Sequence, residues 1–94
     1  MLFVAVSLDK PGMLETRLST RPPHVAWLES LGDTLKLAGP FLGDDGQPLG
    51  SLVIIEAPDQ AAAEAIFKAD PYVAAGLFAS TSVRPWRHVF GKLD

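Results

Sequence analysis

The sequence contains no cysteine, which excludes disulfide bridges, thiolate nucleophiles and cysteine-bound zinc or iron–sulfur clusters. Basic residues are also few: eight Lys and Arg stand against eleven Asp and Glu, for a formal net charge of −3. Such a chain lacks the positive surface that binds a phosphate backbone, so we expect no nucleic-acid partner.

Long hydrophobic segments are missing as well. The first apolar run covers residues 2–8, follows no basic residue and ends at Asp9, so it is too short for a membrane span and unlike a signal peptide. We therefore expect a soluble, cytoplasmic protein with no membrane partner. The glycines form no phosphate-binding loop, because Gly39, Gly43 and Gly46 surround an expected hairpin rather than joining a strand to a helix.

Apolar residues, in contrast, are abundant: 48% of the 94 residues are hydrophobic and only 20% are charged. This length is typical of one domain with one core, so residues 1–94 are expected to form a single domain. A small body has much surface to cover with few polar residues. The composition therefore indicates an apolar surface that is buried against a second chain.

The apolar pattern predicts a β-α-β-β-α-β order. The expected elements are a strand at 2–8, helical segments within 13–31, strands at 34–42 and 51–56, a helix at 58–69 and a strand at 78–90. This order is that of the ferredoxin-like fold, an α+β arrangement with a four-stranded antiparallel sheet and both helices on one face. Its central strands, the first and third, match the two unbroken apolar runs, and prolines fall in the two edge strands. The uncovered sheet face would remain apolar, so we expect a homodimer that forms through it.

Two prolines interrupt the helical segment 13–31. Proline has no amide hydrogen and its ring clashes with the preceding turn, so Pro22 and Pro23 predict a break near residues 20–21. A second helix would then begin with the prolines in its first turn. His24 would lie near that N-terminus, where the helix dipole favours the neutral imidazole that can act as a base.

His24 is the strongest candidate for a catalytic residue. Histidine exchanges protons near neutral pH, and a carboxylate hydrogen-bonded to one ring nitrogen would orient it. Asp70 is the candidate partner, since helix ends in this fold return toward the same edge of the sheet. Simpler interpretations exist for both residues: a surface histidine, and an aspartate that caps a helix beginning at Pro71.

Four further residues are candidates for a substrate pocket. Arg21 can hold an anionic group. For Arg21, and likewise for Arg17, a solvated side chain is the simpler interpretation. Trp27, Phe41 and Tyr72 can form apolar walls, and Trp27 fits core or interface packing equally well.

The sequence indicates neither a metal site nor a serine nucleophile. Asp44 and Asp45 fit a solvated turn better than a cation site, and the spacing of His24 and His88 is not typical of an iron site. The hydroxyl residues near the end of the chain lack a nucleophile-elbow motif, so a hydrolase triad is not supported. We expect no metal and no organic cofactor.

Several segments together resemble the YciI-like (YCII-related) family. They are Arg21-Pro22-Pro23-His24-Val25-Ala26-Trp27-Leu28, Ala38-Gly39-Pro40-Phe41, Asp45-Gly46, residues 50–57, Asp70-Pro71-Tyr72, Ala75-Gly76-Leu77 and residues 83–87. The resemblance implies a ferredoxin-like protomer of the dimeric α/β-barrel superfamily and a His-Asp pair in a pocket, at His24 and Asp70. The sequence departs from the family pattern at Trp27 and Tyr72, where tyrosine and phenylalanine are usual.

The residues and the resemblance together suggest a small, cofactor-free enzyme of lyase or isomerase type. It would move a proton on a small substrate with an aromatic or unsaturated ring, using His24 as general base or acid and Asp70 as the orienting partner. Two alternatives stay open: a dimeric module that binds a metabolite without converting it, and a purely structural dimerisation domain. A His24–Asp70 contact facing a concave pocket would argue against the structural alternative.

Overall fold

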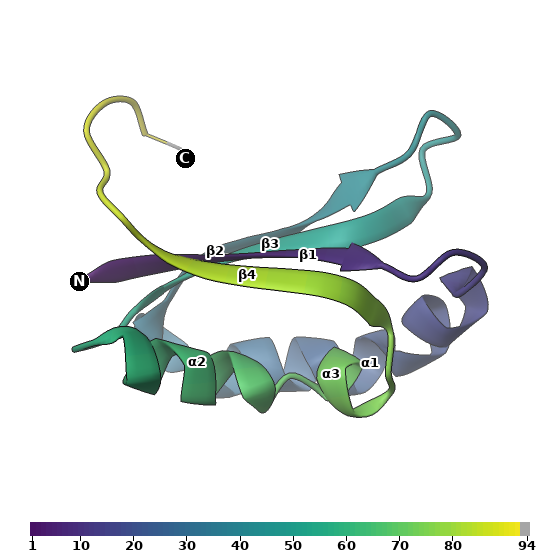
Figure 1. Cartoon of the computed structure of the whole chain (residues 1–94), viewed down its shortest axis with the longest axis horizontal. Coiled ribbons are helices and arrows are strands. Elements are labelled where there is room, and N and C mark those ends of the chain that lie inside the picture. The colour runs from purple at the N-terminus through teal and green to yellow at the C-terminus, as the bar shows by residue number, and fades with distance from the viewer. Residues whose placement is uncertain (93–94) are drawn as a thin grey trace.

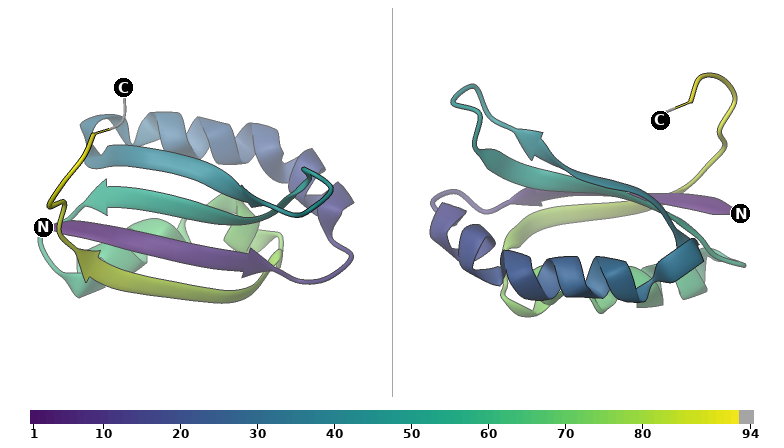
Figure 2. Two further views of the ribbon diagram at one scale, coloured as in Figure 1. Left: turned by 90° about the horizontal axis from the view of Figure 1, so that it is seen from above. Right: turned by 180° about the vertical axis from the view of Figure 1, so that it is seen from behind.

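The computed structural model describes residues 1–92 as a sheet covered on one face by helices (Figure 1). In chain order the elements are β1 (Leu2–Asp9), α1 (Leu14–Ser30), the 3₁₀ turn η1 (Gly32–Thr34), β2 (Leu35–Leu42), β3 (Pro48–Glu56), α2 (Gln60–Lys68), α3 (Pro71–Ala74) and β4 (Phe78–Trp86). The strands pair antiparallel in the order β2-β3-β1-β4, so β1 and β3 are central (Figure 2). The predicted ferredoxin-like α+β fold is confirmed.

The apolar core lies between the sheet and the helices, toward one end of the layer. Phe3 of β1 and Ile55 of β3 turn toward the helices and are at most 1% exposed, and Phe67 of α2 packs with them. Farther along the two strands, the helix-facing positions are Ser7 and Ser51, which pair directly across the β1–β3 ladder. Buried polar side chains therefore lie beside the core, at the other end of the same layer.

A single helix spans the segment in which the prolines predict two. α1 continues through Pro22 and Pro23, so the predicted break near residues 20–21 is wrong. Both prolines lie on the exposed side of the helix, where water can satisfy the carbonyl groups that lose their amide partners. α1 bends after its first turns instead of ending (Figure 2). His24 therefore lies inside a helix, and the expected effect of a helix N-terminus on it does not apply.

The edges of the sheet follow the predicted pattern, with one difference in length. β2 is an edge strand with two irregularities in its pairing to β3, and Gly46 supplies the positive φ of +80° in the turn between them. β4, on the other edge, ends at Trp86 and not at residue 90. Trp86 pairs with Leu2, the first residue of β1, so the chain beyond it has no neighbouring strand to bond to.

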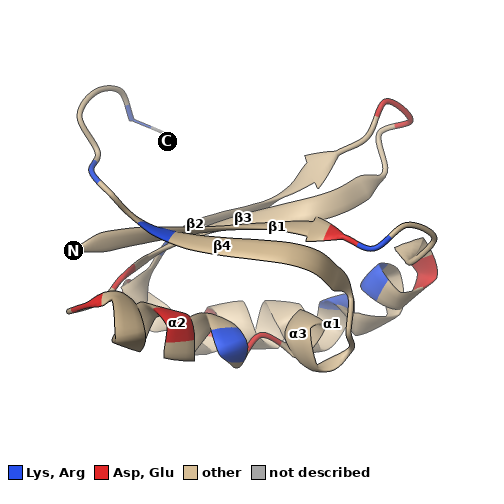
Figure 3. Ribbon diagram, in the orientation of Figure 1, with Lys and Arg blue, Asp and Glu red and all other residues tan. Residues whose placement is uncertain are grey.

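The outer face of the sheet is uncovered in the single chain (Figure 2), and its side chains are apolar along most of β1 and β3. The strand registers place on it Leu2, Val4, Val6 and Leu8 of β1, Leu37 of β2, and Leu52 and Ile54 of β3. Charged residues lie mostly on the helices, loops and strand ends (Figure 3). None of the helices within residues 1–92 is long and apolar enough to cross a bilayer.

Candidate active site

A histidine and a carboxylate from distant parts of the chain meet beneath the sheet. His24 Nδ1 lies 2.8 Å from Asp70 Oδ1, and the two residues are only 8% and 5% exposed. Asp70 is also the N-cap of α3, because the same Oδ1 accepts a hydrogen bond from the amide of Tyr72 at 3.0 Å. The cap holds the carboxylate and the carboxylate holds the ring. The structure thus brings together the two residues predicted as a pair.

The hydrogen bond to Asp70 determines which nitrogen of His24 is available. An ionised carboxylate only accepts hydrogen bonds, so Nδ1 carries the hydrogen and the neutral ring keeps its lone pair on Nε2. Within residues 1–92, Nε2 has no hydrogen-bond partner. Every fully buried side-chain nitrogen or oxygen in this part of the chain does have a partner, so Nε2 is not fully buried. Nε2 is therefore accessible, on a side chain that lines a cavity.

Aromatic rings fix the plane of the imidazole. Tyr72 stacks on His24 with ring centroids 4.0 Å apart and planes inclined by 21°. Trp27 lies on α1 with its ring centroid 5.8 Å from that of His24. Burial raises the pKa of Tyr72, although the guanidinium of Arg17, 4.6 Å from the ring centroid, opposes this effect. Tyr72 is therefore neutral at physiological pH.

Arg17 is a second polar component of the site, and it is buried at 3% exposure. Its Nε and Nη2 donate to the two carboxylate oxygens of Asp9 at 2.6 and 2.8 Å, and Nη2 also donates to Ser51 Oγ at 2.9 Å. Burial by itself would lower the pKa of Arg17, but the hydrogen bonds and charge of Asp9 outweigh this and raise it. Arg17 is a permanently charged and immobilised guanidinium.

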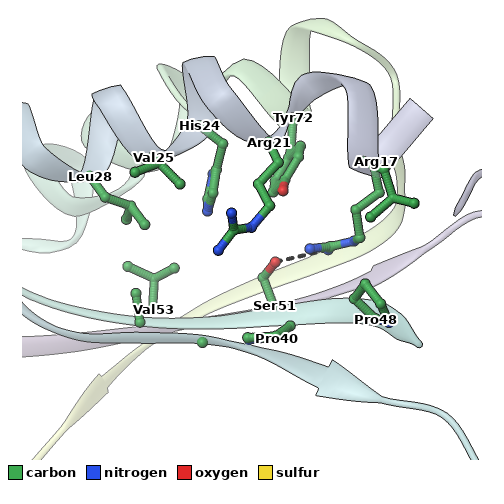
Figure 4. A pocket seen from close by; sticks show the side chains of 13 residues that line it. Arg17, Arg21, His24, Val25, Leu28, Pro40, Pro48, Ser51, Val53 and Tyr72 are labelled. Carbon is green, nitrogen blue, oxygen red and sulfur yellow. Dashed lines mark hydrogen bonds between the residues drawn. The ribbon is translucent and has the colours of Figure 1, made fainter. Parts of the chain in front are cut away.

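These side chains line a cavity of about 210 Å³ between α1 and strands β2 and β3 (Figure 4). Its polar lining consists of Arg17, Arg21, His24, Ser51 and Tyr72, and the remainder is apolar. A buried cavity of about 150 Å³ can hold benzene. The cavity therefore has room for one substituted six-membered ring.

The residues predicted to form a pocket differ in where the structure places them. Arg21 and Tyr72 line the cavity, and the guanidinium of Arg21 lies between His24 and Ser51 (Figure 4). Trp27 contacts the ring of His24 and packs against the core cluster without lining the cavity.

The structure does not bring Phe41 to this cavity. It pairs with Gly50, whereas its neighbour Pro40 pairs with Ser51 and lines the cavity. Side chains alternate between the faces of a strand, so Pro40 and Phe41 cannot both face the helices.

Sequence reasoning considered Arg17 only as a solvated side chain, whereas it is buried, and it missed Asp9 and Ser51. The available signal was the spacing of Arg17, Arg21 and His24, which lie four and three residues apart and share one face of an unbroken helix. The predicted break between them concealed this pattern.

Within residues 1–92, no three side chains of His, Cys, Asp or Glu are grouped so that they could hold a metal ion.

A model of the YCII-related domain matches residues 1–87. The chain belongs to the YCII-related family. Protein YciI of Escherichia coli O6:H1 is 45% identical over 98 residues, which cover 96% of this chain and 100% of that relative. The family resemblance of the sequence is thereby confirmed.

Solved structures with the same fold include one close relative of this YCII-related chain. It is the 5-chloro-2-hydroxyhydroquinone dehydrochlorinase TftG from Burkholderia phenoliruptrix AC1100, in complex with 2,5-dihydroxybenzoquinone. It is 37% identical, with a TM-score of 0.87 over 95% of this chain and 96% of that chain. SnoaB, a cofactor-independent oxygenase from Streptomyces nogalater, has 10% identity and a TM-score of 0.58 over 97% and 96% of the two chains, so it shares the fold alone.

Proposed function

We propose that this protein is an enzyme that transfers a proton on a small ring compound, with His24 as general base or acid and Asp70 as its positioning partner. The observation that carries the proposal is the 2.8 Å hydrogen bond between these buried side chains, on a histidine that lines a cavity of about 210 Å³. A buried pair with one accessible ring nitrogen is suited to proton transfer. General acid–base catalysis of this kind contributes about 10²–10⁴-fold in rate.

The chemistry follows from the two ring nitrogens. Nε2 accepts a proton from a C–H or O–H group of the substrate, and the Asp70 carboxylate stabilises the imidazolium that forms at Nδ1. Return of the proton to another atom of the substrate completes an isomerisation. In an elimination, a leaving group departs instead with its bonding electron pair, and the proton passes to water. Neither reaction consumes an oxidant or a reductant.

The likeness to TftG supports a hydroxylated six-membered ring as the first substrate class to test. That enzyme is named for the dehydrochlorination of such a ring, and the identity of 37% extends over 95% of this chain. The cavity size is consistent with one ring. We therefore propose a lyase or isomerase activity on compounds of this kind.

We also propose that the protein forms a homodimer through the outer face of its sheet. Support comes from the apolar side chains on that face, where Leu8 is 47% and Leu37 38% exposed in the single chain. Residues 87–92 rise beyond the same face (Figure 1), with Val89 and Phe90 80% and 96% exposed. A second copy would remove this apolar surface from water.

The test of the proposed function compares His24→Ala with His88→Ala, since the chain has two histidines and His88 is exposed. Chloride release from 5-chloro-2-hydroxyhydroquinone and exchange of ring hydrogen for deuterium are measured for each variant. We expect His24→Ala to lose at least about 10²-fold in rate and His88→Ala to match the wild type.

Turnover by His24→Ala at the wild-type rate would refute the assignment. Ring compounds that raise the melting temperature of the wild type without turnover or hydrogen exchange would instead identify a binding module.

A further inference from the structure

We propose that a row of hydroxyl side chains on the sheet holds one water molecule against the second carboxylate oxygen of Asp70. Ser7 and Thr81 thereby act as positioning residues for the His24–Asp70 pair, through Asp70 and not through any contact with a substrate. The inference rests on the proposed function for the catalytic importance of the pair, but the water site itself does not depend on turnover.

Three hydroxyl residues lie side by side across the sheet, on the face that the helices cover. Ser7 of β1 pairs with Ser51 of β3 on one side and with Thr81 of β4 on the other. Ser7 and Ser51 are each 5% exposed, and Ser7 Oγ lies 3.0 Å from Thr81 Oγ1. Buried hydroxyl groups cost stability unless they form hydrogen bonds. A row of them in a helix-covered layer is therefore suited to a polar partner.

The carboxylate of Asp70 uses only one of its oxygens within the described chain. Oδ1 accepts from both His24 and the amide of Tyr72, whereas Oδ2 has no hydrogen-bond partner in residues 1–92. Asp70 is 5% exposed, and every fully buried side-chain oxygen in this part of the chain has a partner. Oδ2 therefore borders a space that water can enter. An ionised oxygen binds a donor in such a space strongly.

A small cavity joins this carboxylate to the hydroxyl row. Its volume is about 20 Å³, and its polar lining consists of Ser7, Ser51, Asp70 and Thr81. Asp70 lines this cavity and not the larger one that His24 lines, so we place Oδ2 here. A water molecule needs about 10–15 Å³ and two to four polar partners, and both conditions are met. Thr81 is exposed at the edge of the sheet, which gives water a route inward.

The hydroxyl hydrogens of the row are sufficient to bind this water. One hydroxyl of the Ser7–Thr81 pair donates to the other, which leaves one hydrogen of the pair for the water. Ser51 Oγ accepts from Arg17 Nη2, so its own hydrogen is available as well. The water accepts from these two hydroxyls and donates to Asp70 Oδ2. It then makes the three hydrogen bonds that are typical of a buried water.

A donor at Oδ2 affects the hydrogen bond between Asp70 and His24. It fixes the plane of the carboxylate and takes up part of its negative charge. Without this donor more charge stays on Oδ1, and the bond from Nδ1–H of His24 becomes stronger. The hydroxyl row therefore sets how strongly the carboxylate holds the ring.

A high-resolution crystal structure of the wild type tests the water site. We expect a water oxygen about 2.5–3.0 Å from Asp70 Oδ2, within hydrogen-bond distance of Ser51 and of the Ser7–Thr81 pair. A cavity without water in that structure would overturn the inference.

The double variant Ser7→Ala/Thr81→Val tests the positioning role. Both hydroxyls are removed because either one alone can still donate to the water, and valine keeps nearly the shape of threonine. The Nδ1 hydrogen of His24 is followed by ¹H NMR of protein that contains ¹⁵N-labelled histidine. We expect its resonance to move downfield in the double variant, because the bond to Oδ1 strengthens. An unchanged resonance would refute the positioning role.

Two further variants are controls. Thr81→Ser keeps both hydroxyls, and Ser82→Ala removes a hydroxyl from the next residue, which pairs with Val6 and lies on the outer face. Both should leave the resonance at its wild-type position, and an equal downfield shift in Ser82→Ala would contradict the assignment. If the double variant does not fold, the crystal structure of the wild type decides the inference. Because neither measurement involves turnover, unchanged turnover in His24→Ala would defeat the proposed function and leave the water site standing.

Discussion

Replacing Asp70 with alanine removes two hydrogen bonds at once, because a single carboxylate oxygen accepts from His24 at 2.8 Å and from the amide of Tyr72 at 3.0 Å. Loss of a helix N-cap costs about 0.5–2 kcal/mol. The buried imidazole is left with an unsatisfied N–H, which costs about 1–3 kcal/mol. We expect Asp70→Ala to lower the free energy of unfolding by about 2–4 kcal/mol in total.

Asp59 provides the matched control. It caps α2 by accepting from the amide of Ala62 at 2.8 Å, but its side chain is exposed and bonds to no histidine. Asp59→Ala should cost about 1 kcal/mol, or about 4–8 °C in melting temperature for a chain of this size. The excess in Asp70→Ala, about 1–3 kcal/mol, then measures the contribution of the bond to His24.

The assay is urea unfolding of the wild type and both variants at one protein concentration, together with a double-mutant cycle of Asp70→Ala and His24→Ala. A coupling of about 1–3 kcal/mol is expected. A cost of Asp70→Ala no greater than that of Asp59→Ala, or a coupling near zero, would refute the reasoning.

Asp70→Asn separates stability from activity. Asparagine is a good N-cap and its carbonyl oxygen can accept from Nδ1, so most of the stability should be kept. The negative charge that stabilises the imidazolium is lost, and turnover should fall by about 10²–10⁴-fold. An Asp70→Asn variant that turns over substrate at the wild-type rate would remove Asp70 from the mechanism.

Three further predictions concern the rest of the molecule. Burial raises the pKa of Tyr72, the one tyrosine of the chain, so tyrosinate absorbance should appear at higher pH in the folded than in the denatured protein. The free energy of unfolding should then fall as pH rises past about 10, because the unfolded chain loses a proton that the folded one keeps. A midpoint of the tyrosinate titration in the folded protein at or below that in the denatured protein would contradict this. Gly50→Ala places a Cβ 2.5 Å from the backbone oxygen of Ser7 and should cost about 1–3 kcal/mol in chemical denaturation. Gly39→Ala, with no atom within 4 Å, is its control and should cost less. Leu37→Glu places a charge on the apolar outer face and should convert the proposed dimer to a monomer, as measured by analytical ultracentrifugation. A wild-type protein that is monomeric at micromolar concentration would disprove the dimer.

The strands were predictable because the residues of each strand indicate by themselves whether the strand is central or at an edge. An apolar run without polar alternation requires cover on both faces, which makes β1 and β3 central, and a proline in a strand is tolerated at an edge, as in β2 and β4. The cap at Asp70 was predictable for the same reason, since Asp-Pro is a local signal. The end of β4 was not, because it depends on where β1 begins, 84 residues away from Trp86 in the register pair Leu2–Trp86.

The site could be predicted only in part. No local pattern indicates that His24 and Asp70, separated by 46 residues, lie in contact. The topology of the predicted fold suggested that they could approach, and the family resemblance implied the pair. The burial of Arg17 depends on Asp9 and on Ser51, which reach it from two different strands. A rule that treats each arginine by itself predicts solvent exposure.

The continuity of α1 explains why the wrongly predicted break in this helix also concealed part of the site. Arg17, Arg21 and His24 line one cavity because they repeat at helical spacing on one face, and Pro22 and Pro23 fall on the opposite, exposed side. A helix broken near residues 20–21 would turn Arg17 away from the axis that carries His24, and Arg17 and Arg21 could not line the same cavity. Prolines on the solvent side leave the cavity side of the helix uninterrupted. The bend in α1 lets the first turns of the helix reach Asp9 at the end of β1, while its later turns hold His24 against Asp70.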